Sequence, residues 1–270
     1  MLPSDQKTVE RIVKESGSSF YWGMRCLPEF KRRAMFSIYA FCRVVDDIAD
    51  EKSTKLSKKK QISLWVNKIH NLYKYKDQKT SLLRELRKSI DRFNLEKNDF
   101  LSIIKGMQMD INENILFPES TKLKLYCERV AVAVGFLSID IFQINKKFGK
   151  KYAYSLGMAF QLTNIVRDFK EDLEIKRCYL PKEKLKKFKI KKKIDKLEND
   201  PKIQKVLQEI LKDAHNYFKK SDDFAKKISK SKIIAPEIMK LFYKKIHKKM
   251  WQKKIDFKKK IKLNFVDKIL

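Results

Sequence analysis

Three aspartates near residue 50 are the first candidates for chemistry in this sequence. Asp46 and Asp50 are four residues apart and Asp47 and Asp50 are three apart, so on a helix their carboxylates share one face. The residues before them are mostly apolar, which indicates that the acidic turn continues a core-facing helix. Carboxylates at this spacing repel one another by about a few kcal/mol per close pair at an effective dielectric of about 20. The cluster therefore predicts a compensating cation.

A second polar stripe lies more than a hundred residues later. Gln161, Asn164, Asp168 and Asp172 follow helical spacings of three, four and four, with apolar residues on the opposite faces. Amide and carboxylate oxygens are hard ligands that suit Mg²⁺ held jointly by protein and phosphate oxygens. Either cluster alone could be a helix cap or a surface acidic turn. Two clusters that each end a long apolar helix favour one shared metal site.

The distribution of arginine indicates what the metal site would bind. Carboxylates alone repel an anionic substrate, whereas Mg²⁺ bridges the two and neutralises the charge of a leaving group. Arginine binds phosphate through two parallel hydrogen bonds, which lysine does not do. The basic residues total 64 and include 11 arginines, six of which lie near the acidic segments: Arg25, Arg32, Arg33, Arg43, Arg129 and Arg167. These residues favour a diphosphate substrate.

Long helices must position these side chains. Between residues 31 and 49, Ala34, Ile38, Phe41 and Val45 form the apolar stripe of a packed helix, and Pro28 with Glu29 marks its start. The same periodicity predicts helices over 61–75, 81–93, 97–114, 122–142, 151–172, 203–228 and 233–255. No useful alternating pattern predicts a strand, and glycine and proline number only 6 each. The sequence predicts one all-α domain over residues 1–270, with a loop or a solvated helix face in the lysine-rich stretch 182–196.

The net charge of +31 suggests a nucleic-acid-binding protein, but its distribution does not support that class. The lysines are scattered along every segment, and no zinc-finger, helix-turn-helix or RNA-binding signature accompanies them. We expect no nucleic-acid partner; the alternatives are a generally lysine-rich surface or attraction to anionic lipid headgroups. No stretch reaches the roughly 18 apolar residues that span a bilayer. A cytoplasmic protein is expected, peripheral on the inner face of the membrane if the surface or the weakly amphipathic tail from Ile255 binds lipid. The pattern of the tail favours a last segment that covers the core over a surface-binding helix.

Four ordered motifs carry a family resemblance. They are Ser18-Ser19-Phe20-Tyr21-Trp22, the segment from Tyr39 to Asp50, the segment from Tyr126 to Gly135, and Gln161 to Asp168 followed by Tyr179-Leu180-Pro181. In this order and spacing the sequence resembles the squalene/phytoene synthase family between about residues 16 and 181. The resemblance implies an isoprenoid-synthase helical bundle around a central cavity, with the two acidic helices facing each other. It also implies Mg²⁺-dependent head-to-head joining of two prenyl diphosphates.

The resemblance also assigns roles to residues by position. The metal–diphosphate ligands would be Asp46, Asp47, Asp50, Asp168 and Asp172. The catalytic residues would be Tyr39, Arg43, Tyr126 and Arg167. The substrate-binding residues would be Ser19, Phe20, Tyr21, Asp110, Gln161 and Asn164. Candidates for the apolar wall that shields a carbocation are Met107, Met109, Val130, Val134, Phe136, Leu137 and Phe160.

The amino-acid sequences of three motifs favour one group within the family. Residues 16–22, 44–50 and 135–142 most resemble bacterial enzymes of the hopanoid route, which join two farnesyl diphosphates and stop at presqualene diphosphate without NADPH. Downstream enzymes of the squalene route would then be partners. The alternatives are phytoene synthesis from two geranylgeranyl diphosphates and squalene synthesis with NADPH. A different class also remains: a non-catalytic helical protein that binds membranes or nucleic acid through its basic surface.

Overall fold

The computed structural model describes residues 4–18, 20–113 and 115–252, and within these ranges it contains helices and no strand. A single isolated bridge joins Leu116 to Cys178. The first half contains α1 (Ser4–Glu15), α2 (Phe20–Arg25), α3 (Glu29–Asp50), α4 (Lys55–Lys74), α5 (Ser81–Phe93) and α6 (Lys97–Glu113). The second half contains α7 (Ser120–Cys127), the π-helical turn η1 (Glu128–Val132), α8 (Ala133–Ile141), α9 (Lys146–Arg167), α10 (Phe169–Glu174), α11 (Lys182–Lys187), α12 (Ile194–Leu197), α13 (Ile203–Ala225) and α14 (Lys230–Gln252). The predicted all-α class is confirmed.

The helices begin and end at residues whose chemistry explains the boundaries. Helix α3 starts directly after Pro28, as predicted. The side chains of Thr54 and Thr80 accept hydrogen bonds from the first turns of α4 and α5, so each satisfies a backbone N–H that has no partner within the helix. Asn94 ends α5 in the left-handed conformation, with φ of 50°.

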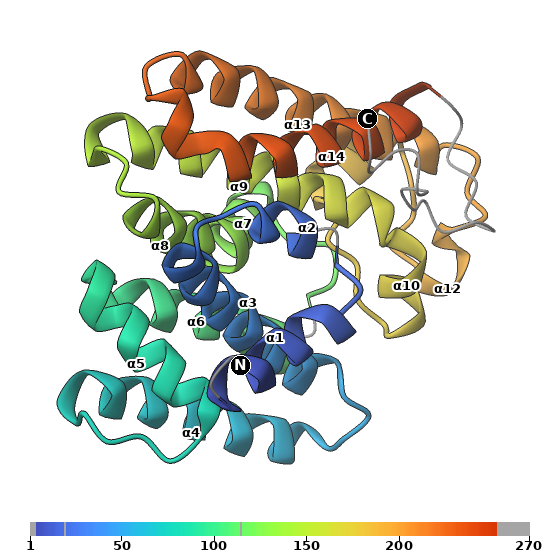
Figure 1. Ribbon diagram of the computed structural model, residues 1–270. Helices are drawn as coiled ribbons and strands as arrows, with labels where there is room; N and C mark the ends of the chain where they lie inside the picture. Colours follow the sequence, from blue (N-terminus) through green and yellow to red (C-terminus); the bar gives the residue numbers. More distant parts are fainter. Residues whose placement is uncertain (1–3, 19, 114, 253–270) are drawn as a thin grey trace.

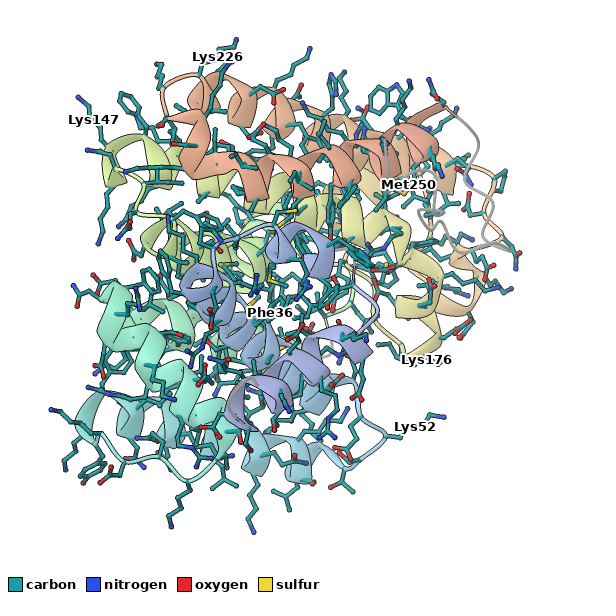
Figure 2. All side chains as sticks on the ribbon, viewed as in Figure 1. Phe36, Lys52, Lys147, Lys176, Lys226 and Met250 are labelled. Carbon is teal, nitrogen blue, oxygen red and sulfur yellow. The ribbon has the colours of Figure 1, made fainter. Side chains whose placement is uncertain are left out.

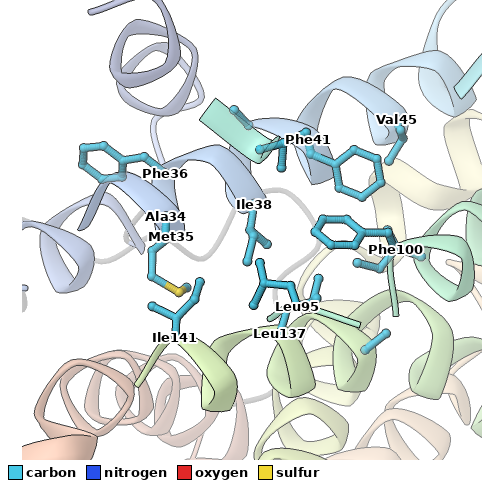
Figure 3. Packing of buried hydrophobic residues seen from close by; sticks show 14 of the residues in the cluster. Ala34, Met35, Phe36, Ile38, Phe41, Val45, Leu95, Phe100, Leu137 and Ile141 are labelled. Atoms are coloured by element: carbon cyan, nitrogen blue, oxygen red, sulfur yellow. The ribbon is translucent and has the colours of Figure 1, made fainter. Parts of the chain in front are cut away.

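Helix α3 runs through the first half of the core. Its residues Ala34, Ile38, Phe41 and Val45 are all buried, which confirms the predicted stripe. Figure 3 shows this face packed against Leu95, Phe100, Leu137 and Ile141. The rings of Phe41 and Phe100 meet edge to face at a centroid distance of 5.4 Å. This packing fixes the direction in which α3 delivers its acidic end.

Helix α9 organises the second half, where it packs along α13 and also contacts α8, η1 and α14. Figure 1 shows α9, α13 and α14 forming one layer and α3 to α6 the other, with α1 and α2 in front. Two buried apolar clusters fill these layers, and Val130, Phe136 and Tyr217 pack against both. Because the clusters share these residues, the layers form one domain.

Two predicted helices are interrupted in the structure. The segment 122–142 is divided by the π turn η1, which places Val132 against Gly157 of α9. The segment 151–172 begins earlier, at Lys146, and breaks at Asp168, whose φ of −98° and ψ of 12° separate α9 from α10. Helix α13 stops at Ala225, before the predicted end at residue 228. These breaks carry no proline or glycine, so periodicity did not reveal them.

The lysines lie mainly on the outside. Figure 2 shows Lys52, Lys147, Lys176 and Lys226 pointing away from the molecule on different sides. In the lysine-rich stretch after Pro181 the chain forms the short helices α11 and α12 joined by loop, so both alternatives hold in part. Among the described residues, no helix is long and apolar enough to cross a membrane. The amphipathic tail from Ile255 lies outside the described residues.

Candidate active site at the ends of two acidic helices

The first acidic cluster forms the last turn of α3. Arg43, one turn earlier, contacts both Asp47 at 2.5 Å and Asp46 at 3.9 Å. About half of the Asp47 side chain is exposed, so this ion pair lies at the mouth of the site. Arg43 therefore already offsets part of the repulsion that the sequence predicted.

The second cluster lies where α9 meets α10. Arg167, the last residue of α9, donates two hydrogen bonds to the carboxylate of Asp168, at 2.8 and 2.5 Å. Asp172 follows in the first turn of α10, so the predicted continuous stripe from Gln161 to Asp172 bends at Asp168. Each acidic cluster thus has an arginine held against a carboxylate, and the Arg167–Asp168 pair has the geometry of two parallel hydrogen bonds that also binds phosphate.

Arg177 connects the two clusters. It follows α10 and donates one hydrogen bond to Asp50 Oδ1 at 2.6 Å and another to the carbonyl oxygen of Ala49 at 2.8 Å. Lys58 donates to the same carbonyl at 2.7 Å. The C-terminal end of a helix carries partial negative charge, so both cations stabilise this end of α3. A pocket of about 280 Å³ opens here, and its lining includes Asp50, Lys55, Lys58, Asp110 and Arg177.

Asp110 is the most buried carboxylate beside this pocket, with 4% of its surface exposed. Its two oxygens accept hydrogen bonds from Tyr126 at 3.0 Å and Tyr179 at 2.7 Å, and the two tyrosine rings stack at 4.8 Å. Burial raises the pKa of Asp110 to about 6, although Arg177 and both tyrosines oppose the shift. Burial, with the negative charge of Asp110, raises the pKa values of Tyr126 and Tyr179 well above their ordinary range. The tyrosines therefore stay protonated, while Asp110 loses its proton around pH 6 and is ionised at neutral pH.

The clusters have too little positive charge for their carboxylates. Burial and the nearby Asp50 raise the pKa of Asp46 to about 7, and burial and Asp168 raise the pKa of Asp172 to about 8. Asn164 contributes a second sign of a missing ligand, because its Oδ1 is buried and accepts no hydrogen bond. Oxygen donors with excess negative charge are the chemistry that a divalent cation requires. The residues present fit Mg²⁺.

The carboxylates do not form a complete metal cage by themselves. Within the described ranges, no three histidine, cysteine, aspartate or glutamate side chains lie close enough together to hold an ion. This arrangement agrees with the usual behaviour of Mg²⁺, which binds through one or two carboxylates together with substrate phosphates and water. Asp46, Asp47, Asp50, Asp168 and Asp172 could each supply such a carboxylate.

An aromatic cluster lies beyond Arg167 and Asn164. The Tyr243 ring stacks on Phe160 at 4.1 Å and approaches Phe20 at 5.5 Å, and Tyr39 lies 6.1 Å from Phe20. The hydroxyl of Tyr39 accepts a hydrogen bond from Ser16. Burial raises the pKa of Tyr243, and the nearby Arg167 and Asn164 side chains oppose this shift. Aromatic faces beside the polar clusters suit a prenyl chain and a developing carbocation.

Other predicted site residues lie in different surroundings. Tyr21 points toward α1 and α3, where its ring stacks on Phe36 and its hydroxyl donates to Glu10. Gln161 accepts a hydrogen bond from Asn164 at 3.4 Å, so it supports that amide. Ser19 lies outside the described residues. Among the wall candidates, Leu137 is fully buried in the core beside α3, and Met107 and Met109 are also buried. Those packed at the edges of the two clusters are Val130, Val134, Phe136 and Phe160.

Sequence reasoning missed three residues of the site: Arg177, Tyr179 and Tyr243. Arg177 is the last arginine in a lysine-rich chain, a signal that the arginine argument could have used. Tyr179 stood within a quoted motif without a role. Tyr243 lies on α14, a helix whose apolar spacing gives no sign of a site. Arg33 was counted among the phosphate-binding arginines, but its two hydrogen bonds bind Glu85 of α5.

Comparison with known proteins identifies the family. A family model described as squalene/phytoene synthase matches residues 13–266. The chain belongs to this family. It is 42% identical to the presqualene diphosphate synthase of Zymomonas mobilis over 86% of this chain and 80% of that protein. It is 37% identical to the presqualene diphosphate synthase of Sinorhizobium fredii over 85% and 82%. The phytoene synthase of Mycobacterium tuberculosis is 31% identical over 70% of this chain and 61% of that protein.

Solved structures confirm the fold. A dehydrosqualene synthase in complex with a ligand matches with a TM-score of 0.78 at 24% identity, covering 98% of this chain and 93% of the other. The squalene synthase HpnC from Alicyclobacillus acidocaldarius matches with a TM-score of 0.80 at 20% identity, covering 93% and 96%. The predicted isoprenoid-synthase fold is therefore correct, and the family match reaches well beyond residue 181. The protein is a prenyltransferase of this family, whose membership implies condensation that depends on a divalent metal.

Proposed function

We propose that this protein is a presqualene diphosphate synthase. It joins two farnesyl diphosphates head to head, forms the cyclopropane of presqualene diphosphate, and releases one diphosphate and one proton. The observation that carries the proposal is the 42% identity to a presqualene diphosphate synthase across 86% of the chain, against 31% across 70% for a phytoene synthase.

The two acidic clusters bind the diphosphate in this proposal. Asp46, Asp47, Asp50, Asp168 and Asp172 would hold Mg²⁺, and the bound ion would supply positive charge for the diphosphate leaving group. Arg43 and Arg167 lie against carboxylates at 2.5 Å, so each guanidinium can move to a diphosphate oxygen when the carboxylate binds metal instead. Loss of diphosphate leaves an allylic carbocation, which the double bond of the second substrate attacks.

Asp110 accepts the proton that is lost when the cyclopropane closes. Its oxygens are held by Tyr126 and Tyr179, and its pKa of about 6 leaves it ionised at neutral pH but able to take up a proton. The tyrosines cannot serve as bases because their pKa values are raised. Tyr126, whose hydroxyl contacts Asp110, can relay the proton from the substrate side.

The aromatic cluster excludes water from the carbocation. Phe20, Phe160 and Tyr243 present ring faces, which stabilise positive charge without a nucleophile. Burial of a C15 chain contributes about 0.8 kcal/mol per methylene and offsets the cost of ordering it. In this proposal the chain is organised as a single isoprenoid-synthase domain, and the protein works in the cytoplasm beside enzymes that consume its product.

Product identification tests the proposal. The purified protein is incubated with farnesyl or geranylgeranyl diphosphate and Mg²⁺, with and without NADPH, and the lipid products are identified by mass spectrometry. We expect presqualene diphosphate from farnesyl diphosphate with or without NADPH. Phytoene from geranylgeranyl diphosphate would replace the proposed substrate, and squalene only with NADPH would replace the proposed end point. No product from either substrate would favour a non-catalytic basic protein.

A further inference from the structure

Among the described residues, the outer face of α14 carries apolar side chains that are largely exposed. Ile234 and Leu241 are each 56% exposed, and Ile238, half-buried between them, lies on the same face. Lys248 continues the stripe one heptad later and is also exposed. The opposite face is buried, with Tyr243, Ile246 and Met250 in the core. The outer face therefore combines apolar side chains with Lys245 and Lys248, four and seven residues after Leu241, while the inner face is buried.

Helix α2 lies beside α14 and extends this surface. A Cβ at Gly23 would lie 2.9 Å from Met239 Cγ, so the two helices touch at that point. Figure 1 shows α2 and α14 on the same side of the molecule. Phe20 faces inward to the aromatic cluster, and Trp22, two positions later, is 55% exposed. We call the exposed Trp22 of α2 and the outer residues Ile234, Ile238 and Leu241 of the adjoining α14 the α2–α14 face.

The rim of the α2–α14 face is basic. Helix α14 contains seven lysines and one carboxylate, and that carboxylate, Glu237, binds Lys240 and Tyr152. Lys230 begins the helix on its exposed side, whereas Lys232 lies on the side of Tyr243 and donates a hydrogen bond to the carbonyl oxygen of Gln143. Burial and the charge of Lys232 lower the pKa of Lys31 on α3, so two cations lie close together at this corner. Such a corner attracts anions.

The α2–α14 face lies directly outside the aromatic cluster. Helix α2 carries Trp22 outward and Phe20 inward, and α14 carries Leu241 outward and Tyr243 inward. Two helices therefore separate the exposed apolar surface from the proposed prenyl site. A lipid bound to the α2–α14 face would therefore be separated from the proposed prenyl site by one layer of helices.

We propose that the α2–α14 face binds the surface of an anionic lipid bilayer. Apolar side chains with one tryptophan would enter the headgroup boundary, and the lysines would contact phosphates. Nucleic acid fits less well, because it offers no apolar layer to Ile234 and Leu241. The orientation toward the prenyl site rests on the proposed function, but the binding itself does not.

Sedimentation with vesicles tests the proposal on the full-length protein. Phosphatidylcholine vesicles with and without phosphatidylglycerol are compared for the wild type, for Ile234→Ser/Leu241→Ser, and for the matched control Leu56→Ser/Leu64→Ser. The control residues are exposed leucines on α4, a helix that is also rich in lysine. We expect wild type and control to bind anionic vesicles equally, and the α14 variant to bind roughly tenfold more weakly or worse.

A charge series separates specific docking from general attraction. Lys230→Gln and Lys248→Gln should each weaken binding about fivefold, whereas Lys59→Gln and Lys60→Gln on α4 should change it less. Equal losses from both helices, or no loss in Ile234→Ser/Leu241→Ser, would overturn the proposal. A wild type that is dimeric in size-exclusion chromatography, with a monomeric α14 variant, would assign the face to a second copy instead.

Activity on detergent-dispersed farnesyl diphosphate distinguishes the two proposals. We expect Ile234→Ser/Leu241→Ser to retain the wild-type rate, because neither side chain reaches the site. Vesicle binding without any prenyl product would overturn the proposed function, whereas the proposal that the α2–α14 face binds a bilayer would stand. Product formation without vesicle binding would do the reverse.

Discussion

Replacement of Asp110 by asparagine should make the metal-free protein more stable at alkaline pH while it abolishes activity. Asp110 is buried, and its two oxygens accept hydrogen bonds from Tyr126 and Tyr179. Asparagine keeps the shape and can still accept one of these hydrogen bonds and donate another. It removes the charge that burial opposes.

The pKa of Asp110 gives the size and sign of the effect. Burial raises this pKa from 3.8 to about 6, so the folded state binds more protons than the unfolded state between these values. Stability therefore falls as pH rises through this range and stays lower above it. At about 1.36 kcal/mol per unit, ionised Asp110 lowers the free energy of unfolding by about 3 kcal/mol. Weaker hydrogen bonds in Asp110→Asn cost about 1 kcal/mol, which leaves a gain of about 2 kcal/mol.

Thermal unfolding in EDTA measures this gain. At about pH 8, Asp110→Asn should melt roughly 4–8 °C above the wild type, and at about pH 4 it should melt at the same temperature or lower. Tyr179→Phe serves as a check, because loss of a donor to the carboxylate should lower the melting temperature more at the higher pH. With Mg²⁺ and substrate, Asp110→Asn should lose roughly a hundredfold or more in kcat.

Two results would refute this reasoning. If Asp110→Asn melted below the wild type at both pH values, the ionised carboxylate would stabilise the fold and its pKa could not be raised. If the variant kept its full rate, Asp110 would not be the proton acceptor, whatever its pKa. The matched surface variant Asp91→Asn, on a half-exposed side chain paired with Arg87, should show neither effect.

Three further changes test other parts of the site. Mg²⁺ should raise the melting temperature more at about pH 8 than at about pH 5.5. At the lower pH protons compete with the metal for Asp46 and Asp172, whose pKa values are about 7 and about 8. An equal rise at both pH values would contradict this prediction. Asp46→Asn and Asp168→Asn should each lower kcat/KM by roughly a hundredfold or more with unchanged circular dichroism, and full activity in both would remove these residues from the metal site. Gly157→Ala should cost about 1–3 kcal/mol in a urea titration, since its Cβ would lie 2.9 Å from the backbone of η1. Gly149→Ala, whose Cβ would meet the Ile144 side chain, should cost less.

Local patterns predicted most of the helices and the two acidic clusters of the site. The apolar stripe of α3 and the acidic turn that ends it depend on residues three and four apart, and this spacing holds in any packed helix. The break at Asp168 and the π turn η1 could not be read in the same way. The π turn lies where Gly106 of α6 leaves room for the Val130 side chain and Gly157 of α9 leaves room for the Val132 backbone, so its position depends on packing between distant segments.

The sequence by itself determined the helical class, the two acidic clusters and, through ordered motifs, the family. These properties depend on residue type and on spacing within single helices. Only the tertiary structure brought Arg177 onto Asp50 across 127 residues, closed Tyr126 and Tyr179 on Asp110, and placed Tyr243 beside Phe20 and Phe160. Contacts between residues so far apart arise when the helices pack together and bury their apolar faces, and no local pattern encodes them.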